Sequence, residues 1–221
     1  MLSLFSVFDP VTFYYSLNWL SVGLLLLMFP QLYWLNFSNY IYMMIFLLNL
    51  LFNEFKLIMK EKFNMNDIIF MMSLFLYIMY NNFMGLFPYI FTCTSHLVFS
   101  VLFSMSMWLS LMFFGWMKNT NFMFTHLVPY GTPFSLMFFM VLIELVSNLI
   151  RPLTLSIRLV ANMIAGHLLL TLLGNFMVKL MNIYFLMLIF QIMLLILEFM
   201  VSIILSYVFV ILMILYLKDT N

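Results

Sequence analysis

The stretch from 183 to 217, IYFLMLIFQIMLLILEFMVSIILSYVFVILMILYL, decides the class of fold. Its one charged residue is Glu198, and its apolar residues run on without the two-residue alternation of barrel strands. A helix needs roughly 20 apolar residues to cross a bilayer core. Because hydrocarbon offers no hydrogen bonds, only helices and closed barrels can span it. The stretch therefore predicts one long membrane helix.

The rest of the chain has the same character, since 67% of its residues are hydrophobic and only 7% are charged. A soluble domain is about 25% charged. No charged residue lies between Asp9 and Glu54, or between Asp67 and Lys118. We expect an all-α polytopic membrane protein forming a single membrane domain over 1–221, with about five transmembrane helices and one interfacial amphipathic helix.

The expected elements follow the apolar runs along the chain. They are a first span over 17–35, an interfacial helix over 39–62, a second span over 68–91, a third span over 95–117 and a long, tilted helical hairpin over 133–217. Pro152 lies inside the hairpin and should kink its first helix. A polar connection containing His126 precedes the hairpin.

The interfacial helix is expected because Asn53 and Lys56 recur at helical spacing opposite Phe52 and Phe55. An ordinary solvated loop is the alternative for 39–62. With these spans, four lysines fall at one face of the membrane, which the positive-inside rule makes the cytoplasm or matrix. They are Lys56, Lys60, Lys62 and Lys118.

Charge and cysteine content exclude several classes of protein. The net charge of +1 argues against a nucleic-acid partner. Cys93 is the only cysteine, so the chain holds no internal disulfide and no CxxC metal site. Neither a secretory signal nor a nucleotide-binding loop is evident. We expect no metal, no cofactor and no catalysis of ATP chemistry by this chain.

Four charged residues lie within apolar helices, namely Glu144, Arg151, Arg158 and Glu198. Each costs about 2.5–3.5 kcal/mol at a helix centre on insertion scales, so such residues face protein or water and mark ion paths by default. Helical spacing places one polar stripe on the first hairpin helix: Glu144, Asn148, Arg151, Arg158, Asn162 and Ala165. A second stripe on the last helix holds Gln191, Glu198, Ser202 and Ser206.

Arg158 stands beside a patch of small residues that includes both alanines of the chain. The patch consists of Ala161, Asn162, Ala165 and Gly166. Small residues let another helix approach closely, and arginine keeps its charge under any realistic shift. The patch therefore indicates a contact with a partner's carboxylate. The alternative for these charges is pairing that only holds the bundle together, and for Arg151 the partner would be Glu144.

His167 and Glu198 form a candidate proton relay, because histidine titrates near neutral pH and both lie within apolar helices. Simple hydrogen bonding of His167 to a neighbouring helix is the alternative. His96 and His126 are expected to be interfacial or capping residues.

The run from Ile150 to Gly174, IRPLTLSIRLVANMIAGHLLLTLLG, closely resembles the signature of the F-type ATP synthase subunit a family, in its mitochondrially encoded form. Further motifs of the family occur in order. They are Phe5-Ser-Val-Phe-Asp-Pro10, Asn82-Phe-Met-Gly-Leu-Phe-Pro-Tyr89, His126-Leu-Val-Pro129 and Ser206-Tyr-Val-Phe209. The resemblance covers nearly the whole chain.

The resemblance implies a non-catalytic stator subunit of the mitochondrial inner membrane, whose two half-channels meet a rotating c-ring and couple proton flow to rotation. It implies peripheral-stalk and other small membrane subunits as further partners. Arg158 matches the arginine that separates the half-channels, with Asn162, Ala165 and Gly166 as its neighbours. His167 and Glu198 match the intermembrane-space channel.

Glu144 matches an acidic position of the matrix-side path in this family. One departure concerns Leu205, where the family usually carries a glutamine that supports the arginine. Support for Arg158 must then come from elsewhere, with Asn162 as the candidate.

Two rival functions remain at this stage. A secondary transporter would show a paired repeat and a substrate-sized polar cluster, and the sequence shows only narrow polar stripes. A purely structural membrane subunit would tolerate apolar replacement of those stripes.

Overall fold

The computed structural model describes residues 4–12, 14–23, 36, 38–59, 65–87, 89–128, 133–179 and 184–220. All regular structure in these ranges is helical, which confirms the expected all-α membrane fold. Three short 3-10 helices are η1 (Leu4–Phe8), η2 (Leu17–Gly23) and η3 (Cys93–Ser95). The α-helices are α2 (Asn39–Met59), α3 (Met65–Leu86), α4 (Leu97–Lys118), α5 (Thr120–Leu127), α6 (Phe134–Lys179) and α7 (Tyr184–Thr220).

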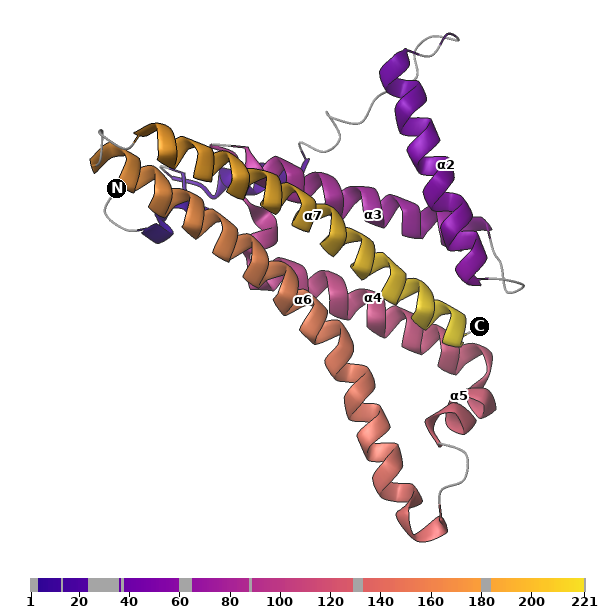
Figure 1. Cartoon of the computed structure of the whole chain (residues 1–221). Helices are drawn as coiled ribbons and strands as arrows, with labels where there is room; N and C mark the ends of the chain where they lie inside the picture. Colours follow the sequence, from indigo (N-terminus) through magenta and orange to yellow (C-terminus); the bar gives the residue numbers. More distant parts are fainter. Residues whose placement is uncertain are drawn as a thin grey trace.

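Four helices form the body of the molecule. The second half of α6 packs along α7 and α4, and α3 packs on α7 (Figure 1). Near its middle, where Pro152 lies, α6 bends, and its first half runs away from α7. Proline removes a backbone hydrogen bond and clashes with the preceding turn, which accounts for the bend. The short helix α5 links the end of α4 to this diverging half.

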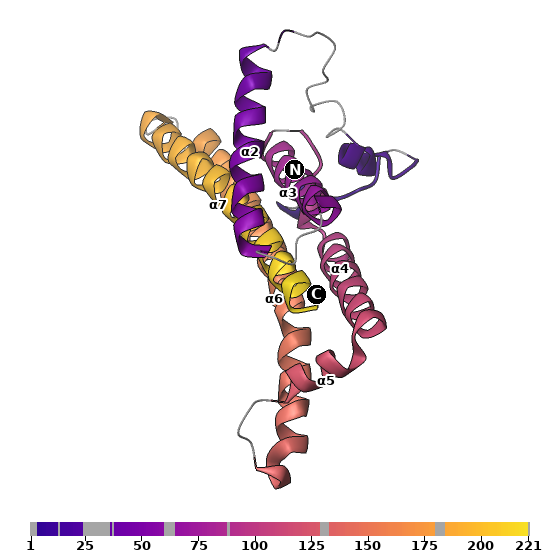
Figure 2. The ribbon, with the colours of Figure 1, turned by 90° about the vertical axis from the view of Figure 1, so that its right-hand side faces the viewer.

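Helix α2 crosses the bundle at a steep angle and packs on α3 and α7. It runs steeply across the direction of α3 in two perpendicular views (Figures 1 and 2). A hydrogen bond of 3.1 Å from the Tyr207 hydroxyl to Glu54 Oε2 ties it to α7. Phe55 and Met59 are buried against the bundle, whereas Asn53 is exposed. Two helices that cross steeply cannot both follow the membrane normal.

Five helices among the described residues are long and apolar enough to cross a membrane: α2, α3, α4, α6 and α7. This set includes α2, for which we expect an interfacial position. Of the expected first span, Leu17–Gly23 forms a 3-10 helix, and 24–35 lies outside the described residues. The depth of each helix in the bilayer therefore stays a prediction.

Helix α5 occupies half of the expected polar connection from Lys118 to Pro133 and includes His126, so the loop prediction for His126 was wrong. The eight residues from Thr120 to Leu127 contain neither proline nor glycine, and nothing in them interrupts a helix before Pro129.

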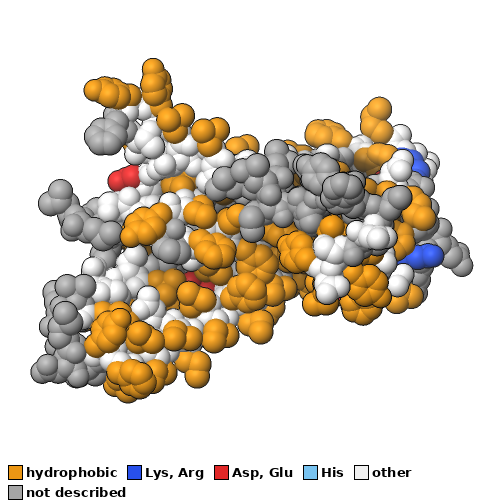
Figure 3. Space-filling model, turned by 90° about the horizontal axis from the view of Figure 1, so that it is seen from above, with side chains coloured by type: hydrophobic (Ala, Val, Ile, Leu, Met, Phe, Trp, Pro, Cys, Tyr) orange, Lys and Arg blue, Asp and Glu red, His pale blue; other side chains and the backbone are white. Residues whose placement is uncertain are grey.

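The interior of the molecule is apolar, as in a soluble protein, but the outer surface differs from that of a soluble protein. The core is apolar and centres on side chains of α2, α3, α6 and α7, among them Phe55, Ile78, Leu159, Phe209 and Met213. The outer surface is apolar too, with Lys and Arg side chains gathered at one end of the face seen in Figure 3. An outer surface of this kind fits lipid as the solvent.

Five buried serine hydroxyls are satisfied within their own helices. Each of five serines donates a hydrogen bond to the carbonyl three residues earlier: Ser100, Ser104, Ser156, Ser202 and Ser206. These side chains therefore add little polarity to the contacts between helices.

Phe209→Ala should destabilise the fold by about 3–5 kcal/mol, because the Phe209 side chain is 1% exposed and its removal leaves a cavity. Phe113→Ala is the matched control, since Phe113 is 68% exposed. Titration with a denaturing detergent measures both. Equal losses for the two variants would show that α7 does not form the core.

Candidate functional site

Glu198 of α7 lies directly against the backbone of α6 at Gly166. A Cβ added to Gly166 would lie 2.7 Å from Glu198 Cδ and 2.8 Å from Oε1. Real Cβ atoms do not approach carboxylates this closely, so only glycine admits the side chain here. Gly166, one of the small residues near Arg158 in the sequence, therefore serves the contact between α6 and α7.

His167 follows Gly166 on α6, and its side chain is half-buried. Both carboxylate oxygens of Glu198 and the Nε2 atom of His167 are buried, and none has a hydrogen-bond partner within the described residues. Buried polar atoms are rarely left without partners. The structure therefore places Glu198 against the residue that precedes His167, and it leaves both Glu198 oxygens and His167 Nε2 without hydrogen bonds among the described residues. Simple bonding of His167 Nε2 to a neighbouring described helix does not occur.

The N-terminal segment covers His167 through Phe8. The rings of Phe8 and His167 meet edge to face with centroids 6.3 Å apart. His96 Nε2 lies 3.1 Å from the backbone oxygen of Phe8, and its ring lies against Trp19 and Phe91. His96 stands at the N-cap position of α4 without capping it by its side chain, so it anchors the N-terminal segment instead.

Beside His167 lies a cavity of about 510 Å³ between the end of α3, the two hairpin helices and η1. Ten residues line it: Val7, Leu86, Phe87, Tyr89, Ile90, His167, Leu170, Thr171, Gln191 and Leu195. His167, Thr171 and Gln191 give its wall polar atoms. The cavity is large enough for water, and its lining includes Leu195, which lies about one turn before Glu198 on α7.

The face of α6 that carries Arg158 is turned outward. Arg158, Asn162 and Ala165 are exposed, as are Arg151 and Ala161, whereas Glu144 is half-buried. Within the described part of the chain, Arg158 has no ion pair and no hydrogen bond to Asn162, so the expected support from Asn162 is not formed. Glu144 and Arg151 likewise form no pair. Leu205 is buried in α7.

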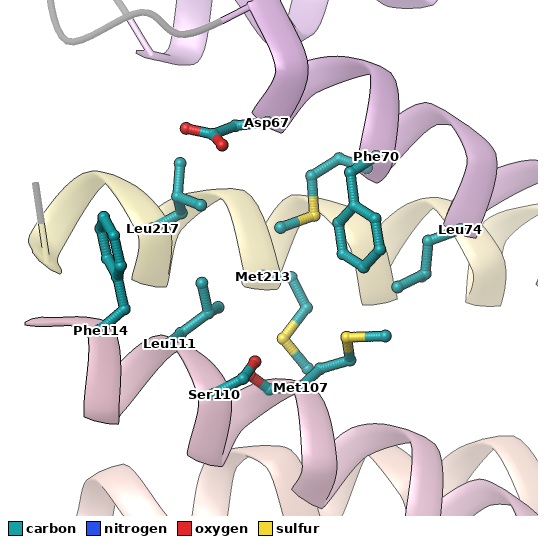
Figure 4. Close-up of a pocket in the computed structure, with 10 residues that line it drawn as sticks. Asp67, Phe70, Leu74, Met107, Ser110, Leu111, Phe114, Met213 and Leu217 are labelled. Atoms are coloured by element: carbon teal, nitrogen blue, oxygen red, sulfur yellow. The ribbon is translucent and has the colours of Figure 1, made fainter.

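A second cavity, of about 240 Å³, lies at the opposite end of the bundle and holds none of the expected site residues. Helices α3, α4 and α7 line it, and its wall is apolar apart from Asp67 and Ser110 (Figure 4).

Phe8 is the residue of this site that the sequence did not single out for a role, whereas His96 was expected as an interfacial or capping residue and not as an anchor of the N-terminal segment. The signal was the motif Phe5–Pro10, which the resemblance included without assigning any of its residues to the channel.

The sequence of this chain is similar to one group of known proteins along nearly its whole length. The family model described as ATP synthase A chain matches residues 15–218. The chain is 52% identical to ATP synthase subunit a of Drosophila melanogaster over 100% of both chains. It is 53% identical to that of Locusta migratoria over 99% of both, and 51% identical to that of Aedes aegypti over 100% of both.

Gly166→Ala should destabilise the packing of α6 on α7 by about 1–3 kcal/mol, because the new methyl group overlaps the Glu198 carboxylate. Gly174→Ala is the control on the same helix, since a Cβ there meets nothing within 4 Å. The free energy of unfolding in mixed micelles measures the difference. A Gly166→Ala variant as stable as Gly174→Ala would contradict the observed contact.

Proposed function

Since this chain belongs to the ATP synthase subunit a family, a proton-translocating subunit of the enzyme's membrane sector, we propose that it carries two proton half-channels that Arg158 keeps apart. The single observation that supports this most is that one face of α6 exposes Arg158 together with Ala161, Asn162 and Ala165. An unpaired arginine facing hydrocarbon costs several kcal/mol, so a protein partner must cover it. The fitting partner is a ring of c subunits, each with a carboxylate.

The order of residues along α6 supports a division into two paths. At 1.5 Å per helical residue, Glu144 lies about 21 Å before Arg158, and His167 lies about 13 Å after it. Glu144 belongs to the half of α6 that diverges from α7, whereas His167 belongs to the half that packs on it. We assign His167 and Glu198 to the intermembrane-space path and Glu144 to the matrix path.

Charge explains how such an arrangement couples flow to rotation. Arginine cannot release its proton under any realistic shift, so no proton passes along α6 through Arg158. A ring carboxylate about 4 Å away would be attracted by roughly 4 kcal/mol at an effective dielectric of 20. It ionises beside Arg158 and must be reprotonated from one half-channel before it can enter the lipid. A proton gains about 2.3 kcal/mol on crossing 100 mV, an energy comparable to the attraction between Arg158 and the ring carboxylate.

Membership of the same family supports a proposal for the membrane in which the chain lies. We assign it to the mitochondrial inner membrane, with α2 along the matrix interface, because α2 crosses α3 steeply and carries Lys56. Peripheral-stalk and other small membrane subunits would cover further parts of its apolar surface. The chain itself carries no ATP chemistry in this proposal, and protons are its only transported species.

Arg158→Ala should abolish ATP-driven proton pumping and ATP synthesis in membranes that contain the assembled complex. The reason is that nothing then forces the ring carboxylate to ionise between the half-channels. Passive proton conductance through the membrane sector, at matched incorporation, shows whether flow stops or becomes an uncoupled leak.

Thr154→Ala is the control for this variant, because Thr154 is exposed on α6 one turn before Arg158 and its hydroxyl donates to the Arg151 carbonyl of the same helix. Normal coupling in Arg158→Ala would make the arginine structural and defeat the proposal.

Glu198→Gln should slow proton translocation severalfold or more, since the amide keeps the shape of the side chain but cannot take up and release a proton. Glu54→Gln tests an acidic residue outside the proposed path, where the glutamate accepts a hydrogen bond from Tyr207. ATP-driven acidification of membrane vesicles compares the two. If Glu54→Gln were slowed and Glu198→Gln were not, the path would have to be drawn along α2.

A further inference from the structure

The cavity of about 240 Å³ at the end of the bundle away from His167 has a buried floor and an exposed rim. Four side chains of α3 and α7, between 1% and 6% exposed, form the floor: Met71, Leu74, Met213 and Leu217. The rim consists of Phe70, Ser110 and Phe114, which are exposed. Helices α3 and α4 both pack on α7. The cavity is therefore a slot between α3 and α4 with α7 at its base, open to the side among the described residues (Figure 4).

The inner part of this slot offers nothing polar to a ligand. The Ser110 hydroxyl donates a hydrogen bond of 2.7 Å to the Met107 carbonyl of its own helix. Methionine side chains from all three helices line the slot, and such side chains adapt to the shape of what they contact. Apolar cavities stay dry, and one of about 150 Å³ already binds benzene. An apolar chain therefore fits this slot better than water does.

One end of the slot is charged. Asp67 lies in the first turn of α3, where that helix begins at one end of the bundle. In Figure 4, Asp67 and Phe114 lie toward one end of the slot, and Leu74 lies toward the other. The carboxylate of Asp67 is thus at the end of the slot where the bundle stops, while the apolar part extends inward from it.

A cation lies beside the same end, on the opposite helix. Lys118 is in the last turn of α4, and its Nζ atom lies 5.4 Å from the centroid of the Phe114 ring. This contact has the geometry of a cation–π interaction, and Phe114 itself lines the slot. The ring therefore holds the ammonium group next to the slot. Charges of both signs, Asp67 on α3 and Lys118 on α4, thus flank one end of an apolar slot.

We propose that the slot binds one molecule of phosphatidylethanolamine from the surrounding bilayer. One acyl chain would lie between α3 and α4, the phosphate beside Lys118 and the ammonium group on Asp67. A primary ammonium group donates up to three hydrogen bonds, and hydrogen bonds between ionised groups are the strong ones. The quaternary ammonium of phosphatidylcholine has no hydrogen to donate. An anionic lipid has no cation for Asp67 and would bring a like charge near it.

The charges favour a lipid over the other occupant that an apolar slot invites, a helix of another subunit. Such a helix would need a cation for Asp67 and an anion for Lys118 at one level of the bundle. A single zwitterionic headgroup carries both charges on adjacent groups, and its acyl chain supplies the apolar part. Complementary charge together with an apolar channel therefore selects the phospholipid.

Photo-crosslinking in the intact ATP synthase tests the proposal. The complex is placed in phosphatidylcholine nanodiscs that contain a trace of a lipid probe with a diazirine on its acyl chain. Ethanolamine, choline and glycerol headgroups are compared on the same acyl chain, and mass spectrometry locates the cross-links. The ethanolamine probe should label Leu111 and Met213 severalfold more than the other two, because it alone can donate hydrogen bonds to Asp67 while its phosphate lies beside Lys118.

Variants assign this preference to the charged end. Asp67→Asn keeps the shape of the side chain and should reduce labelling by the ethanolamine probe to the level of the choline probe. Lys118→Gln should lower labelling by both, since both carry the phosphate. Asp9→Asn is the matched control, because Asp9 is an exposed carboxylate in the N-terminal segment that packs near His167; its labelling should equal that of the unmodified chain. Leu111→Trp should fill the slot and lower labelling by every probe.

Equal labelling by the ethanolamine and choline probes in the unmodified complex would reject the proposal. So would stronger labelling by the glycerol probe, or a preference for ethanolamine that survives Asp67→Asn. A cryo-EM map with a side chain of 24–35 or of another subunit inside the slot would overturn it as well. Native gels report assembly, and where Leu111→Trp fails to assemble, Asp67→Asn decides. The cross-link is measured without proton flow, so its failure is distinct from failure of the half-channel proposal.

Discussion

The contact between the Glu198 carboxylate and the backbone at Gly166 is the interaction on which the arrangement of the hairpin depends. It brings α6 and α7 closer than any side chain at 166 would permit, and it places a carboxylate inside the bundle rather than on its surface. From that contact follow the position of His167 one residue later and the cavity beside it. The N-terminal segment around Phe8 packs against the same histidine.

One side of helix α6 faces the bundle and the other faces outward. Its inner side, with Leu155, Leu159 and Met163, is buried in the bundle. Its outer side carries arginine, asparagine and alanine. Neither lipid nor the described part of this chain supplies a partner for the charge of the arginine. A helix built in this way is incomplete alone, and the small side chains around Arg158 set how near a second helix can come. The subunit thus carries one half of an interface, for which we propose the ring of c subunits as the other half.

The helical membrane fold and the main charged residues could be predicted from the sequence, because charged residues contrast sharply with the apolar runs around them. In a chain with so few charges, Glu198 and Arg158 stand out within apolar runs, and helical spacing assigns them to faces. Phe8 offered no such contrast, because the chain holds 28 phenylalanines and the contact of Phe8 with His96 joins residues 88 positions apart. The helix α5 was missed because a polar composition alone does not distinguish a loop from a short helix.

The buried serines have a consequence for how such a chain can evolve. Each closes its hydrogen bond within its own helix, so the cohesion of the bundle rests on the shapes of apolar side chains and hardly at all on polar cross-links. Exchange among leucine, isoleucine, methionine and phenylalanine then changes volumes by small amounts and costs little when neighbours adjust together. Such exchanges can therefore accumulate in the interior without loss of the fold. The methionine- and phenylalanine-rich composition of this chain is what such drift would leave behind.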